Sequence, residues 1–488
     1  MRRTSTSALL RIWISAIAVF LGGLVASTLP ARAQCTNTAG NNAVYGTCSG
    51  SVSTQGSPAY IDASAVTQGT DFCDTLYKII SGGTYPSGGA VIDARGFGTS
   101  ITCAAGSTPW TNGTAFAGNP ATILLPAGTI TISNTWILPL YGRIVGQGPG
   151  LTTIVPGSGF TSNPAETDNT ITAMVEMGSR STHLDFCGTN TDCVGVGVQD
   201  LTLNLNGASI PYGIYNAASQ ELSYVDNVVF NNVGNSSTDT YALEVTVVSG
   251  PSSSNSGPYS NLICNIGAGA TALTRCVDLT AHTRGVQGIS CNGGTASPTA
   301  AIYLDSDGNA IEDVYVNNFL NGIYVGSQAA STNLLEAPSN VLYNINGGSA
   351  VTNLIHISSN LASSSIPPAC PGGTSRQAVC DLTIMNATAA ANTTIQDDLN
   401  TPALTVTGGD GNVGVYILGE QIGTTSTTPV QYTRFTTSPR VPTWGSGNTT
   451  PSGVCTATTS TGSIYSNVTT GTGGGLYACI GTSWAKIP

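Results

Sequence analysis

The stretch of sequence that decides the fold runs from residue 200 to residue 344, where one five-residue pattern occurs six times. Its copies are Asp200-Leu-Thr-Leu-Asn204, Asn227-Val-Val-Phe-Asn231, Asn261-Leu-Ile-Cys-Asn265, Gly288-Ile-Ser-Cys-Asn292, Asp313-Val-Tyr-Val-Asn317 and Asn340-Val-Leu-Tyr-Asn344. The closing asparagines follow one another after 27, 34, 27, 25 and 27 residues. Because a period of this size without a helical pattern marks stacked coils of strands, the sequence predicts a β-solenoid.

The repeated asparagine has a physical reason in such a fold. Coils that stack at the strand spacing of ~4.8 Å place the same position of successive coils in one line. Asparagine tolerates the left-handed backbone region at a turn, and its amide can hydrogen-bond to the asparagine of the next coil. We therefore expect one asparagine column, ending at Asn344, which fixes the side chains of every coil that face outward.

A second set of strands lies between the pentapeptides, and its middle residues should face outward because the apolar residues beside them face the core. These outward residues are Tyr215, Glu244, Asp278, Tyr303, Tyr324 and His356. The corresponding residues of the asparagine strands are Thr202, Val229, Ile263, Ser290, Tyr315 and Leu342. The first line holds acids and aromatic rings, so it is the better candidate for a functional surface.

The chain before the repeats is interpreted as a cap followed by the first coils. An amphipathic pattern from Asp71 to Ile80 predicts a short helix capped by Asp71. Strand-like segments follow at residues 88–96, 123–132, 136–139 and 143–154. A solenoid needs its open end covered, and a helix in this place covers it.

Three of these segments, with the helix before them, resemble a known family. They are Gly88-Gly-Ala-Val-Ile-Asp-Ala-Arg-Gly96, Leu124-Leu-Pro-Ala-Gly-Thr-Ile-Thr-Ile-Ser133 and Arg143-Ile-Val-Gly-Gln-Gly-Pro-Gly-Leu-Thr-Thr-Ile154. They resemble the opening of the pectate lyase-like superfamily, in the branch with phage tailspike-type and rhamnogalacturonase- or epimerase-like domains. The resemblance covers about residues 71–420 and implies an all-β fold, a right-handed single-stranded parallel β-helix. Because the superfamily holds lyases, hydrolases, epimerases and non-catalytic proteins, it does not imply one activity.

The resemblance supports a groove but supplies no catalytic residues. The active groove of the superfamily commonly lies along strands such as Gly322-Ile-Tyr324, which favours the line of Tyr215 to His356. The polygalacturonase-like hydrolases carry Asn-Thr-Asp, Asp-Asp, Gly-His-Gly and Arg-x-Lys motifs, and this chain has only a faint echo at Thr238-Asp239. Its lysines stand at positions 78 and 486 alone, which excludes a lysine-assisted site here. Tailspike relatives are trimers, so the resemblance makes a homotrimer one candidate assembly.

Composition shifts divide the chain into five parts. They are a signal peptide at 1–33, an N-terminal extension at 34–70, the parallel β-helix with its helical cap at 71–422, a linker at 423–452, and a small disulfide-closed C-terminal β module at 453–488. The last coils are expected at 381–384, 403–406 and 414–417, where the asparagine pattern is lost. The C-terminal module is either a solubilising end cap or a unit for attachment or oligomerisation.

The first 33 residues predict the location of the protein. Arg2, Arg3 and Arg11 precede an apolar run at 12–26, and Ala31-Arg-Ala33 fits a cleavage site before Gln34. We therefore expect a secreted or cell-surface protein, with an uncleaved membrane anchor as the alternative. No other segment is apolar and long enough to cross a bilayer.

The charge of the chain excludes several classes of partner. Without the signal peptide it has 10 basic and 25 acidic residues, a net charge of −15. Such a chain has no electrostatic basis for binding nucleic acid or anionic lipid. It also repels polyuronates unless calcium bridges the two, which favours a neutral or weakly charged glycan.

All 13 cysteines follow the expected cleavage site, which indicates disulfides formed in an oxidising compartment. The local pairs that spacing suggests are Cys35–Cys48, Cys73–Cys103, Cys187–Cys193, Cys370–Cys380 and Cys455–Cys479. Cys264, Cys276 and Cys291 are left, and three cysteines cannot all pair within one chain. Cys264 and Cys291 should stack inward, either bonded or as two small apolar side chains. A zinc site is not expected, since no Cys-x-x-Cys occurs and the three histidines lie far apart.

The outward line predicts a carbohydrate site. Glu244 and Asp278 belong to consecutive coils, so their carboxyl groups should lie roughly 5 Å apart, as in a retaining glycosidase. Like charges this close raise the pKa of one of them, as a general acid requires. Further catalytic candidates are Asp305, His282 and Arg284, and the substrate-binding candidates are Tyr215, Tyr303, Tyr324 and His356. Asp305 and Asp307 are candidate ligands for calcium, with an ordinary turn as the alternative.

Two hypotheses of different class follow. The first is an exported polysaccharide-active β-helix protein that cleaves a glycan by paired carboxylates or by calcium-assisted elimination. The second is a non-catalytic, adhesin-like surface protein that uses the solenoid as a rigid spacer. Whether the protein is an enzyme at all is left open by the sequence.

Overall fold

The computed structural model describes the solenoid and short strands beyond it. The described residues are 59–66, 69–82, 89–110, 120–164, 171–179, 186–187, 193–206, 210–234, 240–246, 255–295, 298–306, 308–326, 340–357, 382–389 and 393–397, with the later strands given below. The signal peptide and residues 34–58 of the N-terminal extension lie outside them, as do the pairs Cys35–Cys48, Cys370–Cys380 and Cys455–Cys479. Within these ranges, no helix has the length and apolar character needed to span a membrane.

The larger sheet of the described chain has 16 strands. Its main path is β1 (Ala59–Asp62), β2 (Ala90–Asp93), β4 (Ala121–Leu124), β7 (Arg143–Val145), β10 (Gly197–Asn204), β12 (Tyr224–Val233), β14 (Tyr259–Ile266), β16 (Val286–Asn292), β18 (Ala310–Asn317), β20 (Val341–Gly347), β22 (Thr383–Ala389), β24 (Thr405–Thr407) and β27 (Tyr432–Thr433). Beside this path lie β3 (Ser100–Thr102), β5 (Gly128–Asn134) and β8 (Thr152–Thr161).

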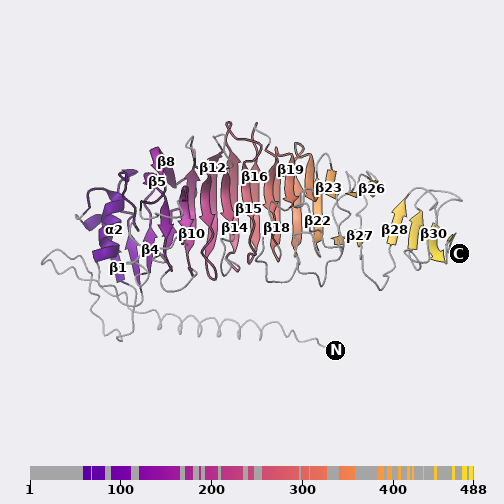
Figure 1. Ribbon diagram of the computed structural model, residues 1–488, viewed down its shortest axis with the longest axis horizontal. Coiled ribbons are helices and arrows are strands. Elements are labelled where there is room, and N and C mark those ends of the chain that lie inside the picture. Colours follow the sequence, from indigo (N-terminus) through magenta and orange to yellow (C-terminus); the bar gives the residue numbers. More distant parts are fainter. Residues whose placement is uncertain are drawn as a thin grey trace, which may run out of the picture.

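The second sheet has 11 strands and takes one strand from each coil between those of the first. Its strands are β6 (Trp136–Leu138), β9 (Ala173–Met177), β11 (Tyr212–Asn216), β13 (Tyr241–Val245), β15 (Arg275–Leu279), β17 (Ala300–Leu304), β19 (Asn321–Val325), β21 (Asn353–Ile357), β23 (Thr393–Asp397), β25 (Val415–Ile417) and β26 (Glu420–Ile422). The pairs from β9 to β25 are parallel, and Figure 1 shows the strands side by side in chain order. The fold is therefore the right-handed parallel β-helix that the sequence predicts.

Both sheets change direction at their last strands. β24 pairs antiparallel with β27, and β25 pairs antiparallel with β26. A separate sheet follows, made of β28 (Trp444–Gly447), β29 (Ile464–Asn467), β30 (Gly475–Ile480) and β31 (Ser483–Lys486). Antiparallel closure ends the run of stacked coils, because the next parallel strand would need a further full coil.

The asparagine column exists as predicted over five coils. Asn204 pairs with Asn231, Asn265 with Asn292, and Asn292 with Asn317. Asn265 also donates its side-chain amide to the side-chain oxygen of Asn231 at 2.9 Å. The geometric expectation drawn from the repeat, amides lying over one another in successive coils, is confirmed.

The left-handed backbone lies at the opening residue of each pentapeptide rather than at the closing asparagine. The openers with positive φ are Asp200, Asn227, Asn261, Gly288 and Asp313, and Asn344 and Asn386 have the same backbone conformation in the next two coils. They form a second ladder, in which Asn227 donates to Asp200 at 2.6 Å and Asn344 to Asp313 at 2.7 Å.

The sixth repeat therefore starts four residues later than the sequence predicts. Asn344 opens its coil opposite Asp313, so it is not the sixth closing asparagine. Leu342, expected to face outward, is fully buried opposite Ile311, and Asn346 takes the place beside Tyr315. The error is physical, since an asparagine suits both the opening and the closing position.

Two segments expected as single strands are each two strands. The segment 123–132 contains the end of β4 and most of β5, separated by the turn around Pro126, which has no amide proton for a ladder. The segment 143–154 contains β7 and the start of β8, separated by a turn with glycines at 146, 148 and 150.

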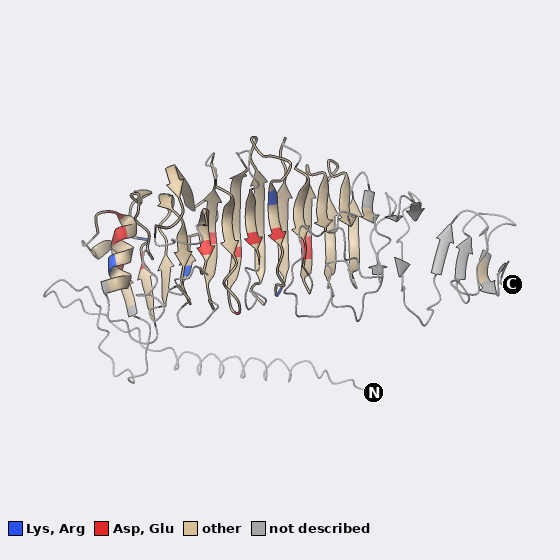
Figure 2. Cartoon of the chain, in the orientation of Figure 1, with Lys and Arg blue, Asp and Glu red and all other residues tan. Residues whose placement is uncertain are grey.

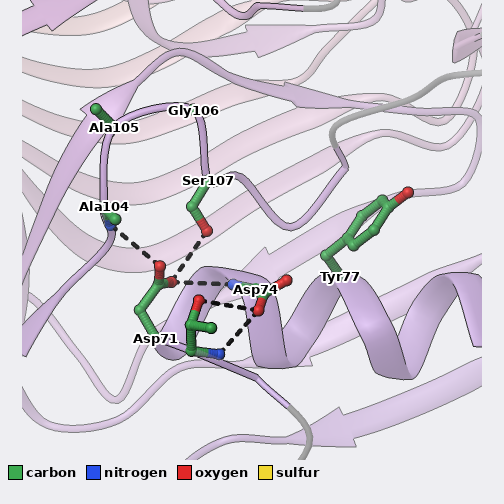
Figure 3. Close-up of a pocket in the computed structure, with 8 residues that line it drawn as sticks. Asp71, Asp74, Tyr77, Ala104, Ala105, Gly106 and Ser107 are labelled. Atoms are coloured by element: carbon green, nitrogen blue, oxygen red, sulfur yellow. Dashed lines mark hydrogen bonds between the residues drawn. The ribbon is translucent and has the colours of Figure 1, made fainter.

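The predicted cap helix is α2 (Phe72–Gly82), which follows a short 3-10 helix at Ala63–Ala65. Asp71 caps it as expected, accepting the amide of Asp74 at 3.0 Å. The same carboxylate accepts the Ser107 hydroxyl at 3.0 Å and the Ala104 amide at 3.3 Å (Figure 3). Asp71 thus fastens the start of the helix to the loop after β3.

Asp71→Ala is expected to lower the free energy of unfolding by about 1–2 kcal/mol, because helix and loop lose a shared acceptor. Chemical denaturation measures the change. Glu312→Ala on the surface of β18 is the control, with an expected change within about 0.5 kcal/mol. Equal losses in the two variants would contradict the capping role.

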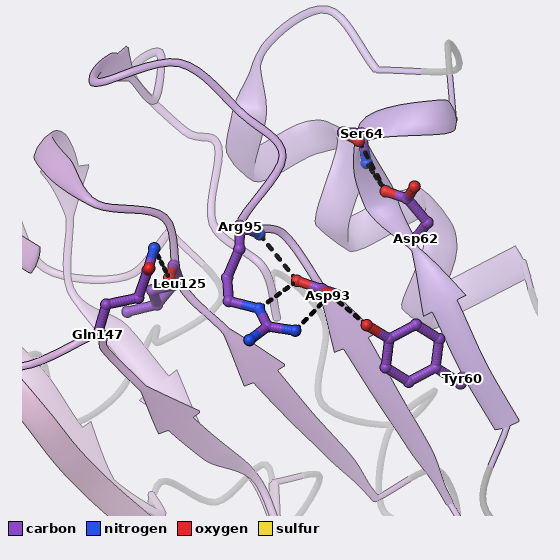
Figure 4. A network of polar contacts seen from close by, with 7 residues as sticks. All are labelled: Tyr60, Asp62, Ser64, Asp93, Arg95, Leu125 and Gln147. Atoms are coloured by element: carbon purple, nitrogen blue, oxygen red, sulfur yellow. Dashed lines mark hydrogen bonds and ion pairs between the residues drawn. The ribbon is translucent and has the colours of Figure 1, made fainter. Parts of the chain in front are cut away.

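The first coil is fastened at its outer surface by a second polar network (Figure 4). Asp93 accepts the Tyr60 hydroxyl and binds the Arg95 guanidinium at 2.8 and 2.9 Å. Arg95 holds the pKa of Asp93 well below its usual range. Asp62 also accepts hydrogen bonds from the amide and the hydroxyl of Ser64 and so caps the 3-10 helix. The edge strand β1 is therefore held through Tyr60 to β2 and through Asp62 to the 3-10 helix.

Two of the described disulfides are those that spacing predicts. Cys73–Cys103 joins the cap helix to the region after β3, and Cys187–Cys193 closes a loop before β10. The sequence leaves the pairing of Cys264, Cys276 and Cys291 open, and in the structure Cys264 forms a disulfide with Cys276. Cys291 stacks beside Cys264 as a buried free thiol whose pKa is raised by burial.

Candidate functional site

The predicted outward line is one column of strand partners. Tyr215 pairs with Glu244, Glu244 with Asp278, Asp278 with Tyr303, Tyr303 with Tyr324, and Tyr324 with His356. The register continues to Glu176 before Tyr215 and to Gln396 after His356. We call these eight residues the outward column. Figure 2 shows acidic residues on neighbouring strands along the solenoid, with few basic residues among them.

The column is less open to solvent than expected. Tyr215, Asp278 and Tyr303 are 7%, 3% and 5% exposed, so the expectation of an open surface is wrong for them. Tyr215 does lie outside the coil interior, since it packs in a small cluster separate from the main core. Aromatic rings packed against neighbouring rings cover one another, and this alone removes much of their surface.

The C-terminal half of the column is an aromatic stack. The rings of Tyr303 and Tyr324 lie 5.5 Å apart and nearly parallel, at 16°. His356 meets the edge of Tyr324 at 5.1 Å and shares a 3.2 Å hydrogen bond with the Asn321 side-chain oxygen. Tyr324 and His356 keep part of their surface exposed, so a ligand can reach this end of the column.

A second outward row runs beside the column, and sequence reasoning missed it. Tyr212 pairs with Tyr241 and Tyr241 with Arg275, each three residues before a member of the column. The signal was available as an i−3 spacing that repeats in three successive coils. A strict period of two, applied to each strand alone, does not reveal it.

Arg275 is the centre of the site. Its guanidinium forms an ion pair with Asp278 and lies over two rings, at 5.3 Å from the centroid of Tyr241 and 4.1 Å from that of Tyr303. The residue is 6% exposed. A planar cation held between aromatic faces and a carboxylate is fixed in position, and it favours the ionised form of that carboxylate.

Glu244 has the opposite electrostatic character to its neighbour Asp278. The pKa of Glu244 is raised to about 8, first by burial and then by the charge of Asp278, with Arg275 offsetting part of the rise. One of its carboxyl oxygens is buried without a hydrogen-bond partner among the described residues. Adjacent strands therefore carry a carboxyl group whose pKa is raised, Glu244, opposite one that is held in an ion pair, Asp278.

Glu176 adds a third acidic side chain that the sequence analysis did not name. It lies on β9 opposite Tyr215 and is 3% exposed. The strand precedes the first asparagine repeat, and the Cys187–Cys193 loop separates the two. The periodicity that located the other members of the column therefore does not reach it.

The remaining predicted site residues do not belong to the column. Asp305 lies next to the column, where its charge helps burial to raise the pKa of Tyr303. His282 and Arg284 lie in the turn after β15, with His282 packed beside Gly308 and Arg284 exposed. Asp307, the second candidate calcium ligand, lies outside the described residues.

A cavity of about 420 Å³ beside the cap helix is the competing location. Its acidic side chains are already engaged: Asp71 holds the loop after β3, and Asp74 accepts from Thr70 and pairs with Lys78 at 2.9 Å. Asp71 also lies within reach of Cys73 and Cys103, but these two form a disulfide and offer no thiolate to a metal. The cavity belongs to the cap.

Comparison with known proteins gives structural neighbours only. No family model and no curated protein matches the sequence. An alginate lyase from Paenibacillus sp. str. FPU-7 is 12% identical, over 61% of this chain and 97% of that one, with a TM-score of 0.32. The A-module of the mannuronan C-5 epimerase AlgE4 of Azotobacter vinelandii is 13% identical, over 59% and 85%, with a TM-score of 0.25. ORF18 of Geobacillus virus E2 is 9% identical, over 77% and 79%, with a TM-score of 0.29.

Proposed function

We propose that this protein is an exported, polysaccharide-active β-helix protein that cleaves a glycan with Glu244 as the acid and Asp278 as its ionised partner. The observation that carries the proposal is the placement of two carboxyl groups in register on adjacent strands, of which only Asp278 is paired with a guanidinium. Burial keeps Glu244 protonated, and Arg275 holds the charge of Asp278. Two acids whose environments separate their pKa values suit general acid and nucleophile.

The spacing of the pair suggests the stereochemical course. Adjacent strands lie about 4.8 Å apart, so carboxyl groups in register are close to the 5–5.5 Å of retaining glycosidases. Glu244 donates its proton to the glycosidic oxygen while Asp278 attacks the anomeric carbon. After the leaving sugar departs, Glu244 takes a proton from a water molecule whose oxygen attacks the anomeric carbon, which breaks the bond from that carbon to Asp278 and restores the Asp278 carboxylate.

Export is supported by the disulfides. Cys73–Cys103, Cys187–Cys193 and Cys264–Cys276 suit a chain that folds in an oxidising compartment. Calcium bound by Asp305 and Asp307 is a separate proposal, and it suits elimination rather than hydrolysis. A rise in Tm on adding calcium, absent in Asp305→Asn, is the result expected if calcium binds there.

A panel of neutral and acidic polysaccharides tests the function directly. Cleavage is read as new reducing ends, elimination as unsaturated ends, and each assay is run with calcium and with EDTA. Glu244→Gln and Asp278→Asn are each expected to lower kcat at least about 100-fold, while Glu312→Gln on β18 keeps full activity. Undiminished cleavage by the first two variants would reject the acid pair.

The second candidate is a non-catalytic surface protein, and the covering of the column favours it. A stack with Asp278 and Tyr303 only 3% and 5% exposed suits a rigid spacer. This candidate predicts that the panel shows no product of either kind. Reproducible product formation by the purified protein would exclude it.

A further inference from the structure

We propose that the site takes an uncharged glycan and disfavours uronate chains, because its central guanidinium, Arg275, is enclosed and neutralised by the protein itself. The inference rests on the proposed glycan site and adds its substrate class. It assigns Arg275 and Asp278 a role in specificity, since their ion pair determines whether a cation is free to meet a substrate carboxylate.

The enclosure of Arg275 is the first argument. Proteins recognise carboxylates mainly through arginine forks or through a bridging metal ion. A uronate that approached Arg275 would have to displace Asp278 and part the rings of Tyr241 and Tyr303, which lie on the guanidinium. With 6% of its surface exposed, Arg275 cannot make a second fork outward.

The carboxyl groups near Arg275 are the second argument. Asp278 is 3% exposed, and a charge so poorly screened by water acts strongly on a second negative charge brought beside it. Glu244 in its protonated form presents a hydrogen-bond donor that suits a hydroxyl or an ether oxygen. The inner surface of the site thus offers an uncharged donor and negative charge.

The rest of the chain acts in the same direction. It contains 25 acidic and 14 basic residues, and its two lysines, Lys78 and Lys486, lie on the cap helix and on the last strand. A negatively charged protein slows the approach of a polyanion, and salt weakens that effect. Affinity for a uronate chain should therefore rise with ionic strength, whereas affinity for a neutral chain should stay constant.

The experiment compares two forms of one oligosaccharide. The probe is a hexasaccharide of a glycan that the panel shows to bind, in a neutral form and in a form with carboxylates at C6. If the glycan is neutral, oxidation at C6 gives the charged form; if it is a uronate, reduction of its carboxylates gives the neutral form. Both are titrated calorimetrically into the full chain in EDTA. We expect the neutral form to bind at least about tenfold more tightly at low salt.

Asp278→Asn tests the cause of the selectivity. It frees the guanidinium of Arg275 and removes a negative charge, so the uronate form should gain roughly tenfold in affinity. Glu312→Gln makes the same charge change on the other sheet and should leave the ratio unaltered. An unchanged ratio in folded Asp278→Asn would remove the assigned role of the pair.

The two proposals fail in different ways. Equal or tighter binding of the uronate form by the unaltered protein overturns the substrate class and leaves the glycan site standing. Binding of no glycan in the panel overturns the glycan site, and the substrate class with it. The comparison on the unaltered protein decides the matter even if a variant does not fold.

Discussion

Glu244→Gln is expected to make the protein more stable above pH 5 and to leave its stability at pH 4 unchanged. The pKa of Glu244 is about 8 in the folded chain against 4.5 for an ordinary glutamate, so folding takes up a proton between these values. The stability linked to that proton is complete below pH 4.5 and is lost as the pH rises toward 8, at up to ~1.4 kcal/mol per unit. Because glutamine does not titrate, the variant keeps this stability as the pH rises.

The difference between variant and unaltered protein should reach about 2–4 kcal/mol at pH 8, after allowance for the partial exposure of the side chain. Chemical denaturation at pH 4, 5, 6, 7 and 8 measures it. Glu312→Gln, the same chemical change on β18, should stay within about 0.5 kcal/mol over the range. A difference that does not grow with pH would show that Glu244 is an ordinary carboxylate.

Asp278→Ala is expected to lower the free energy of unfolding by about 3–5 kcal/mol, because it leaves the buried Arg275 guanidinium without its carboxylate. Removing both charges in Arg275→Met/Asp278→Leu should cost far less, within about 1 kcal/mol of the unaltered protein. The contrast between single and double variant is the signature of a buried ion pair, and denaturation at pH 7 measures it.

The first coil offers a matched control for this pair. Asp93 and Arg95 also form an arginine–carboxylate pair, but the Arg95 side chain is 49% exposed. Asp93→Ala should therefore cost about 1 kcal/mol or less. If Asp278→Ala and Asp93→Ala lower the free energy of unfolding equally, burial does not strengthen the Arg275–Asp278 ion pair. The argument that an enclosed Arg275 selects the substrate then fails as well.

The arrangement of the column could be predicted from the sequence because two periods act together. The interval of about 27 residues stacks the coils, and the period of two within each strand assigns Glu244 and Asp278 to one face. Both follow from backbone geometry, which the apolar pattern determines.

Exposure could not be predicted in the same way. Whether Tyr303 is open or covered depends on how its ring packs against Tyr324 and Arg275, and such contacts involve rotamers rather than periods. Glu176 could not be assigned to the column from the sequence, because it lies before the first repeat. Asn344 was misplaced because asparagine fits the left-handed opener and the closing position alike.

The central claim is that Glu244 is a neutral acid beside an ionised Asp278 at neutral pH. Infrared difference spectroscopy between the unaltered protein and Glu244→Gln at pH 7 tests it without any substrate. The account predicts the C=O band of a protonated carboxylic acid that is absent from the variant and disappears near pH 8. A carboxylate band for Glu244 at pH 7 would contradict it.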